Sequence, residues 1–198
     1  MKACGLIGSP VKGGNVDLLV RQVLDGAAAR GAETRAIDLN ELAIRPCQSC
    51  GADPSPSWCC LDDDMQRVYG ALEESEVVVL GSPVYFDTVS AQVKLMIDRC
   101  NCLAPLVRRP DGTVAFDRRL KPRKHGVLVA VAGAEQDFET LRTTAAAFFS
   151  WIHADLVETL FYGHDDEETG GVRGDEAWMK RAFDAGARAA EAATASSE

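Results

Sequence analysis

Five short apolar runs alternate along the chain with longer segments in which apolar residues recur every three or four positions. The runs predict strands at about 2–7, 33–39, 77–80, 126–131 and 156–162. The longer segments predict amphipathic helices, which begin near 16, 62, 91, 138 and 176. This alternation of strands and helices is typical of a parallel sheet covered by helices on both faces.

Polar alternation separates the central strands from the edge strands. Segment 77–80 is wholly apolar, as a strand buried on both faces must be, whereas segment 33–39 alternates and suits an edge. We therefore predict one α/β domain over residues 1–198, a three-layer, doubly wound fold of the flavodoxin-like type. Its five-stranded parallel sheet is expected to have the strand order 2-1-3-4-5. Two irregular parts interrupt the pattern, a cysteine-containing insert at about 45–61 and a hairpin-like excursion at about 101–124.

The tetrapeptide Gly-Ser-Pro-Val occurs twice, at 8–11 and 81–84, each time directly after a predicted strand. In the predicted order these two strands are neighbours, so both loops lie at the carboxyl edge where open α/β sheets bind ligands. The first loop suits a phosphate, because a helix N-terminus donates backbone N–H groups and glycines allow close approach. Asn15 is expected to cap that helix. The residues expected at the phosphate are Ser9, Lys12, Gly13, Gly14, Asn15 and Val16.

The second loop suits a flat ring, since Pro83 stiffens it and two aromatic side chains follow. The residues expected at the ring are Ser82, Pro83, Val84, Tyr85, Phe86 and Asp87. A phosphate next to a flat ring indicates a mononucleotide and favours flavin. The competing interpretations are an ordinary strand–helix turn in the first loop and aromatic residues that simply cover the sheet in the second.

Charge and cysteine content limit the function classes. The net charge of −9 argues against nucleic acid and anionic membranes as partners. The longest uncharged apolar stretch, 126–134, is shorter than the roughly 20 residues of a membrane span. The first residues enter a strand pattern directly, so we expect no signal peptide. Seven cysteines without such a signal favour a cytoplasmic protein with no disulfide framework.

Taken together, these motifs resemble the NAD(P)H-dependent FMN reductase and iron–sulfur flavoprotein group of the flavodoxin-like superfamily. The resemblance implies FMN, held by its phosphate at the first loop and by its ring at the second. It also implies that a third loop, 132–134 with Gly133, lies at the far edge of the flavin, and that the chain forms a homodimer or homotetramer. The stretches that carry the resemblance are 8–15, Cys47-x-x-Cys50 through Cys59 to 63–65, 81–86, 90–94, Asp98-Arg99 and 174–176.

The cysteine segment departs from the pattern of that group. Cys47, Cys50 and Cys59 match three ligand positions, but Asp53 stands where another cysteine is expected. Iron–sulfur clusters usually take four thiolates, and Cys60 is too close to Cys59 in sequence for both to reach one metal easily. We predict no metal ligands here. An iron–sulfur cluster and a zinc ion are the alternatives, and thiols without metal would form a redox-active pair or be inert.

Two charged segments stand apart from the loops. The excursion can bind the 2′-phosphate of NADPH or an acidic protein, although a solvated loop is favoured. The acidic run at 164–168 is likewise expected to be a solvated loop. The excursion carries seven of the 21 positively charged residues: Arg108, Arg109, Arg118, Arg119, Lys121, Arg123 and Lys124.

The predicted function is that of an FMN-dependent NAD(P)H oxidoreductase. It would take a hydride from NAD(P)H and pass electrons to a free flavin, a quinone or a similar small-molecule acceptor. No catalytic side chain is named, because the cofactor carries the chemistry. The main alternative is an iron–sulfur flavoprotein that acts as an electron-transfer carrier, and a flavin-containing redox sensor is a third class.

Overall fold

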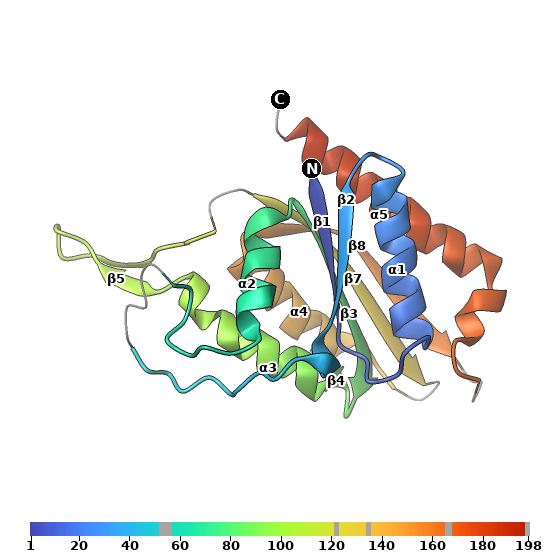
Figure 1. Ribbon diagram of the computed structural model, residues 1–198, viewed down its shortest axis with the longest axis horizontal. Coiled ribbons are helices and arrows are strands. Elements are labelled where there is room, and N and C mark those ends of the chain that lie inside the picture. Colours follow the sequence, from blue (N-terminus) through green and yellow to red (C-terminus); the bar gives the residue numbers. More distant parts are fainter. Residues whose placement is uncertain (52–56, 121–122, 134–135, 165–167, 197–198) are drawn as a thin grey trace.

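A parallel sheet with the strand order β2-β1-β3-β7-β8 forms the centre of the structure (Figure 1). The computed structural model describes residues 1–51, 57–120, 123–133, 136–164 and 168–196. All four neighbouring pairs in this path are parallel, which confirms the predicted order. The strands are β1 (Lys2–Ile7), β2 (Glu33–Asp38), β3 (Val77–Tyr85), β7 (Lys124–Gly133) and β8 (Ala154–His164).

Helices cover both faces of this sheet, giving the three layers that the sequence pattern predicts (Figure 1). On one face, α1 (Asn15–Ala28) and α5 (Glu176–Ala195) pack over one hydrophobic core. On the other face, α2 (Met65–Glu74), α3 (Ala91–Arg99) and α4 (Glu139–Trp151) cover a second core. Among the described residues, none of the helices has the length and hydrophobicity of a transmembrane segment.

The second Gly-Ser-Pro-Val segment is a strand and not the loop that the sequence suggests. β3 continues to Tyr85, because Pro83 still pairs with Val131 of β7. The chain then reverses through Phe86 and Asp87, whose φ angles are 50° and 58°. Two successive left-handed residues are typical of the tight hairpin turn that joins β3 to the antiparallel β4 (Thr88–Val89). The segment that the sequence predicts to bind a ring is therefore held in the sheet as a paired strand.

The N-terminus of α1 also differs from the expectation. Gly14 occupies the N-cap position and no side chain caps the helix. The side chain of Asn15 instead accepts a hydrogen bond of 3.0 Å from the backbone N–H of Val172. A contact between residues 157 positions apart could not be read from local sequence.

The excursion forms the predicted hairpin, with β5 (Leu106–Arg108) paired to β6 (Val114–Phe116). Several of its described positive charges are buried or bound to other groups of the chain. Lys124 is buried in β7 and donates to the carbonyl oxygen of Ser75 at 2.7 Å. Arg119 donates to three backbone carbonyl oxygens and Arg123 pairs with Asp155. Lys121 lies outside the described residues. In the described segments the fold also contains three short 3₁₀ helices, η1 (Leu39–Glu41), η2 (Cys100–Leu103) and η3 (Gly171–Gly174).

Candidate functional site

The two Gly-Ser-Pro-Val segments lie side by side at the carboxyl edge of the sheet, as predicted. The backbone N–H of Gly8 donates to the carbonyl oxygen of Gly81 at 2.8 Å. Ser90 joins the segments, because its hydroxyl donates to the Gly8 carbonyl at 2.6 Å and its N–H donates to Ser82 Oγ at 3.0 Å. Ser82 is fully buried and serves this joint.

A cleft of about 250 Å³ opens beside this joint, between the ends of β1, β3, β7 and β8. Its walls bring together three segments that the sequence predicts to bind one ligand: the first loop, the end of β3 and the end of β7. Eight predicted residues line it: Ser9, Gly14, Asn15, Val16, Pro83, Val84, Tyr85 and Gly133.

The start of α1 forms the end of the cleft at which the sequence predicts phosphate binding. Because the helix has no side-chain cap, its first N–H groups are free to bind an anion. Within the described part of the chain, the N–H groups of Asn15 and Val16 have no acceptor. Ser9 Oγ accepts a bond of 3.1 Å from the N–H of Val11, so its own hydroxyl proton remains available. This arrangement suits a phosphate held by backbone donors.

A fourth wall, which sequence reasoning missed, comes from the segment after β8. His164, Glu168, Thr169 and Gly170 line the cleft, so this acidic run is not simply a solvated loop. Asp165, Asp166 and Glu167 lie outside the described residues. Gly170 has a φ of 79°, and a Cβ there would lie 2.4 Å from the carbonyl oxygen of Gly13. The position of this segment after the last parallel strand was the available signal, because that strand ends at the same edge.

The remaining residues that line the cleft lie in or next to elements already described. The side-chain oxygen of Gln136 accepts a bond of 3.1 Å from the N–H of Gly133, the last residue of β7. Ala134, the last residue of the predicted third loop, lies outside the described residues. Ala132, the first residue of that loop, also lines the cleft, and Val11 and Val131 are further lining residues that were not predicted as contacts.

Five predicted residues do not line the cleft. Lys12 extends away and pairs with Glu41, and the N–H of Gly13 bonds to Asp17 at 2.9 Å. Phe86 is 98% exposed at the tip of the hairpin turn, with Asp87 beside it. Ser82, buried in the joint, is the fifth.

The charge of the cleft is set by backbone groups rather than by basic side chains. Among the described lining residues there is no lysine or arginine, and Glu168 is acidic. The uncapped helix start is therefore the feature of the cleft that suits an anion, while Pro83, Val84 and Tyr85 offer an apolar wall to a flat ring. Tyr85 is 44% exposed, which leaves its ring accessible to a ligand. These residues fit FMN, with its phosphate at α1 and its ring at the end of β3.

Comparison with known proteins agrees with this geometry. The profile of a family described as NADPH-dependent FMN reductase matches residues 1–166. The chain belongs to this family. Members are flavin-dependent oxidoreductases, which is the chemistry that the cleft suits.

Sequence relatives of this FMN reductase family member are iron–sulfur flavoproteins. One from Methanocaldococcus jannaschii is 31% identical, covering 96% of this chain and 96% of its own. Another, from Archaeoglobus fulgidus, is 31% identical over 97% of this chain and 80% of the relative. A third, from Methanosarcina thermophila, is 27% identical and covers 87% of this chain and 82% of its own.

Solved structures support the fold. A flavone reductase superposes with a TM-score of 0.75 at 19% identity, over 98% of this chain and 63% of that chain. A flavodoxin from the domain Archaea superposes with a TM-score of 0.58 at 12% identity, covering 98% of this chain and 99% of its own. These likenesses confirm the flavodoxin-like architecture.

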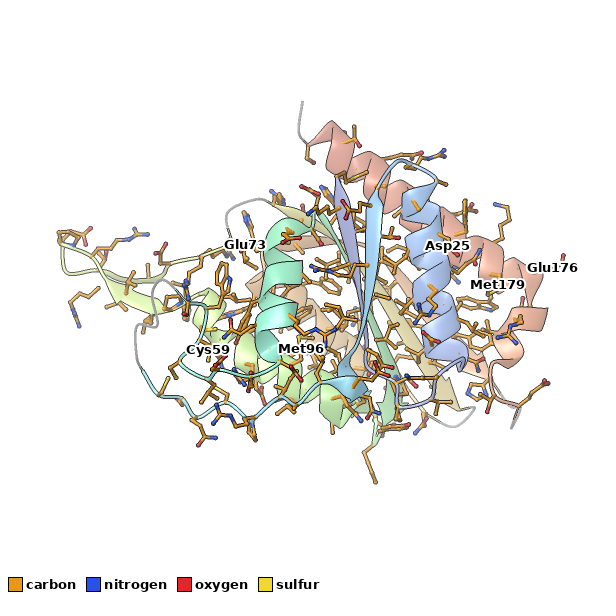
Figure 2. The ribbon with its side chains drawn as sticks, viewed as in Figure 1. Asp25, Cys59, Glu73, Met96, Glu176 and Met179 are labelled. Atoms are coloured by element: carbon orange, nitrogen blue, oxygen red, sulfur yellow. The ribbon has the colours of Figure 1, made fainter. Side chains whose placement is uncertain are left out.

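The cysteine segment of this family member does not assemble a metal site within the described residues, where no three cysteine, histidine or acidic side chains converge. Cys50 and Cys60 have their sulfur atoms 3.1 Å apart, whereas Cys59 packs against the core beside α2 and α3 (Figure 2). Asp53 lies outside the described residues. The described thiols therefore do not fit the four-thiolate set of a cluster.

Neighbouring groups move the pKa values of two of these thiols in opposite directions. Burial alone would raise the pKa of Cys59, but hydrogen bonds from the Leu61 backbone and the Arg99 guanidinium outweigh it and lower that pKa. The contact with Cys50 raises the pKa of Cys60 to about 11. Of Cys59 and Cys60, Cys59 is thus the thiol that ionises more readily.

Proposed function

We propose that this chain is an FMN-dependent NAD(P)H oxidoreductase that passes electrons to a free flavin, a quinone or a similar acceptor. The observation that carries the proposal is the uncapped start of α1 facing a cleft with an apolar wall. The backbone N–H groups of Asn15 and Val16, with the Ser9 hydroxyl, would hold the phosphate. Pro83, Val84 and Tyr85 would hold the ring. When bound, FMN supplies hydride and electron exchange, so the chain's own residues bind and orient.

The substitution Asn15→Asp tests this assignment. A carboxylate at this position keeps an acceptor for the Val172 N–H, so the fold should be retained. It also places negative charge beside the proposed phosphate, and we expect the Kd for FMN to rise about tenfold or more, which corresponds to about 1.4 kcal/mol. Titration of the apoprotein with FMN, followed by flavin fluorescence, measures this change.

Asn101→Asp is the matched control, because it makes the same change at an exposed position in η2. It should leave FMN affinity unchanged. Equal FMN affinity in Asn15→Asp and the wild type would show that the phosphate does not bind at α1. An apoprotein that binds no FMN at all would refute the whole proposal.

A second function, electron transfer without pyridine nucleotide, is favoured by one observation. The relatives are named iron–sulfur flavoproteins, and Cys47, Cys50 and Cys59 of this chain resemble three positions of the cysteine pattern of such proteins. Anaerobic stopped-flow mixing of the FMN-loaded protein with NADPH separates the two functions. Rapid bleaching of the flavin supports the reductase. Inertness toward NADPH and NADH, with reduction by a low-potential ferredoxin, supports the carrier.

The cellular setting forms part of the same proposal. The odd number of cysteines, seven, supports a reducing compartment, the cytoplasm. The resemblance to oligomeric flavoproteins supports a homodimer or homotetramer. Sedimentation velocity of the FMN-loaded protein measures the assembly, and a monomer at all concentrations would contradict this part.

A further inference from the structure

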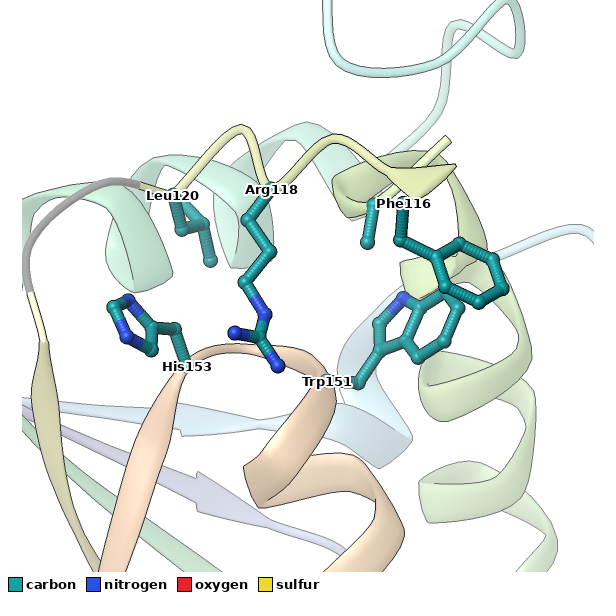
Figure 3. Close-up of a pocket in the computed structure, with 6 residues that line it drawn as sticks. Phe116, Arg118, Leu120, Trp151 and His153 are labelled. Carbon is teal, nitrogen blue, oxygen red and sulfur yellow. The ribbon is translucent and has the colours of Figure 1, made fainter. Parts of the chain in front are cut away.

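A second cavity, of about 450 Å³, lies between the segment that follows the β5–β6 hairpin and the turn from α4 into β8 (Figure 3). It is far from the flavin cleft. His153 precedes β8 and lines this cavity, whereas His164 ends β8 and lines the cleft. A strand of 11 residues separates the two sites by roughly 30 Å. The residues that line the cavity are Ala104, Phe116, Arg118, Leu120, Trp151 and His153.

One side of the cavity is an aromatic wall. The rings of Phe116 and Trp151 meet edge to face with centroids 4.9 Å apart. The indole N–H of Trp151 donates to the carbonyl oxygen of Cys100 at 3.0 Å, which fixes the orientation of that ring. Phe116 is 56% exposed despite its size. A fixed indole and a half-exposed phenyl ring offer a stacking surface to a flat ligand.

The positively charged side chain of Arg118 lies between this aromatic wall and His153. Figure 3 shows the side chain of Arg118 descending between His153 on one side and Trp151 on the other. Within the described part of the chain, Arg118 has no hydrogen bond or ion pair. Its neighbours are engaged, because Arg119 donates to the carbonyl oxygen of Trp58 and Arg123 pairs with Asp155. Arg118 is therefore available for an anion, and guanidinium groups suit carboxylates and phosphates.

His153 adds a polar group that the fold does not use. Its Nδ1 atom is buried, and no described residue hydrogen-bonds to it. Its backbone has a φ of 62°, a left-handed conformation that glycine or asparagine adopts at lower cost. Backbone strain at a residue whose side chain has an unsatisfied polar atom is typical of a binding site.

We propose that this cavity binds a small organic anion made of a flat ring and a carboxylate or phosphate group. The ring lies against Trp151 and Phe116, and the anionic group binds Arg118 and His153. Because roughly 30 Å separates the cavity from the cleft of the same chain, this ligand is distinct from an electron donor or acceptor bound at that cleft.

Isothermal titration of the FMN-loaded protein tests the proposal with two probes, benzoate and phenyl phosphate. We expect saturable binding of at least one probe. Tighter binding of phenyl phosphate identifies phosphate as the preferred anion, and tighter binding of benzoate identifies carboxylate. Cyclohexanecarboxylate, which has the charge without the flat ring, should bind at least severalfold more weakly than benzoate.

Two variants locate the site. Arg118→Gln should weaken binding about tenfold or more, and His153→Asn, which suits the left-handed backbone, should weaken it severalfold. Arg109→Gln removes another arginine of the hairpin region outside the cavity and should have no effect. If neither probe shows saturable binding, or if Arg118→Gln binds both probes as the wild type does, the proposal is wrong.

Discussion

Arg99 and Asp63 form a buried ion pair on the side of the sheet that α2 and α3 cover. The distance from Arg99 Nη1 to Asp63 Oδ2 is 2.6 Å, and the Arg99 side chain is fully buried. The same nitrogen donates to the carbonyl oxygen of Arg45 at 2.8 Å, so the guanidinium fastens the start of the cysteine segment. A buried charge of this kind depends on its partner.

Removing the partner should be costly. We expect Asp63→Asn to lower the free energy of unfolding by about 3–5 kcal/mol, because it leaves the Arg99 charge buried and unpaired. Asp155→Asn removes an exposed partner, that of Arg123, and should cost at most about 1 kcal/mol. Urea unfolding followed by circular dichroism compares the two. Similar losses in both variants would contradict the argument.

Lys124 makes the stability depend on pH. Burial lowers the pKa of its ammonium group below the ordinary value of 10.5. Between the lowered folded pKa and 10.5, the unfolded chain binds more protons at this side chain than the folded chain does. The Lys124 contribution to the free energy of unfolding therefore rises with pH through that window.

The substitution Lys124→Met should remove this contribution. The lost hydrogen bond to the Ser75 carbonyl shifts the stability of the variant by a constant amount, so the slope against pH is the informative quantity. We expect the slope between neutral pH and 10.5 to be lower in Lys124→Met than in the wild type. Lys94→Met, at an exposed position of α3, should leave the slope unchanged. Parallel curves for all three proteins would show that Lys124 titrates normally.

At the scale of elements, α1 and α5 pack backbone to backbone. A Cβ atom at Gly26 would lie 1.9 Å from the carbonyl oxygen of Phe183, and one at Gly186 would lie 1.8 Å from that of Val23. No side chain fits at such distances, so the two glycines set the spacing of the helices. Sequence periodicity places both glycines on helices but does not show that they face each other.

Because of this contact, we expect the substitution of glycine by alanine to have opposite effects on stability at Gly186 and at Gly70. Gly186→Ala must push α5 away from α1, and we expect it to lower the free energy of unfolding by about 2 kcal/mol or more. Gly70→Ala in α2 meets no atom within 4 Å and should raise stability by about 0.5–1 kcal/mol, because alanine favours helix. Thermal unfolding measures both. A tolerated Gly186→Ala would mean that the helices are more loosely packed.

For the whole molecule, the net charge of −9 opposes the approach of an anionic donor such as NADPH. Salt screens this repulsion, since the Debye length falls from about 30 Å at 0.01 M to about 8 Å at 0.15 M. Under the proposed function, we expect the second-order rate constant for flavin reduction by NADPH to rise severalfold over that range. An uncharged dihydronicotinamide should show no such rise, and a rate that falls with salt would reveal local attraction at the cleft.

The architecture was predictable because its signals are local. Wholly apolar runs such as 77–80 mark central strands and polar alternation at 33–39 marks an edge, and the flavodoxin-like fold type that the alternation of strands and helices indicates supplied the strand order. Adjacent parallel strands end at one edge of the sheet, and this rule alone placed the two Gly-Ser-Pro-Val segments together. The sequence therefore determined the sheet, its layers and the position of the cleft.

The tertiary structure decided which side chains face the cleft, because their partners are remote in sequence. Lys12 pairs with Glu41, 29 positions away, and Asn15 bonds to Val172, 157 positions away. Only the folded chain brings the segment after β8 against the start of α1 and leaves that helix without a cap. Local patterns specify where an element begins and which face it buries. The side chains left free to meet a ligand depend on contacts that form only when distant segments pack together.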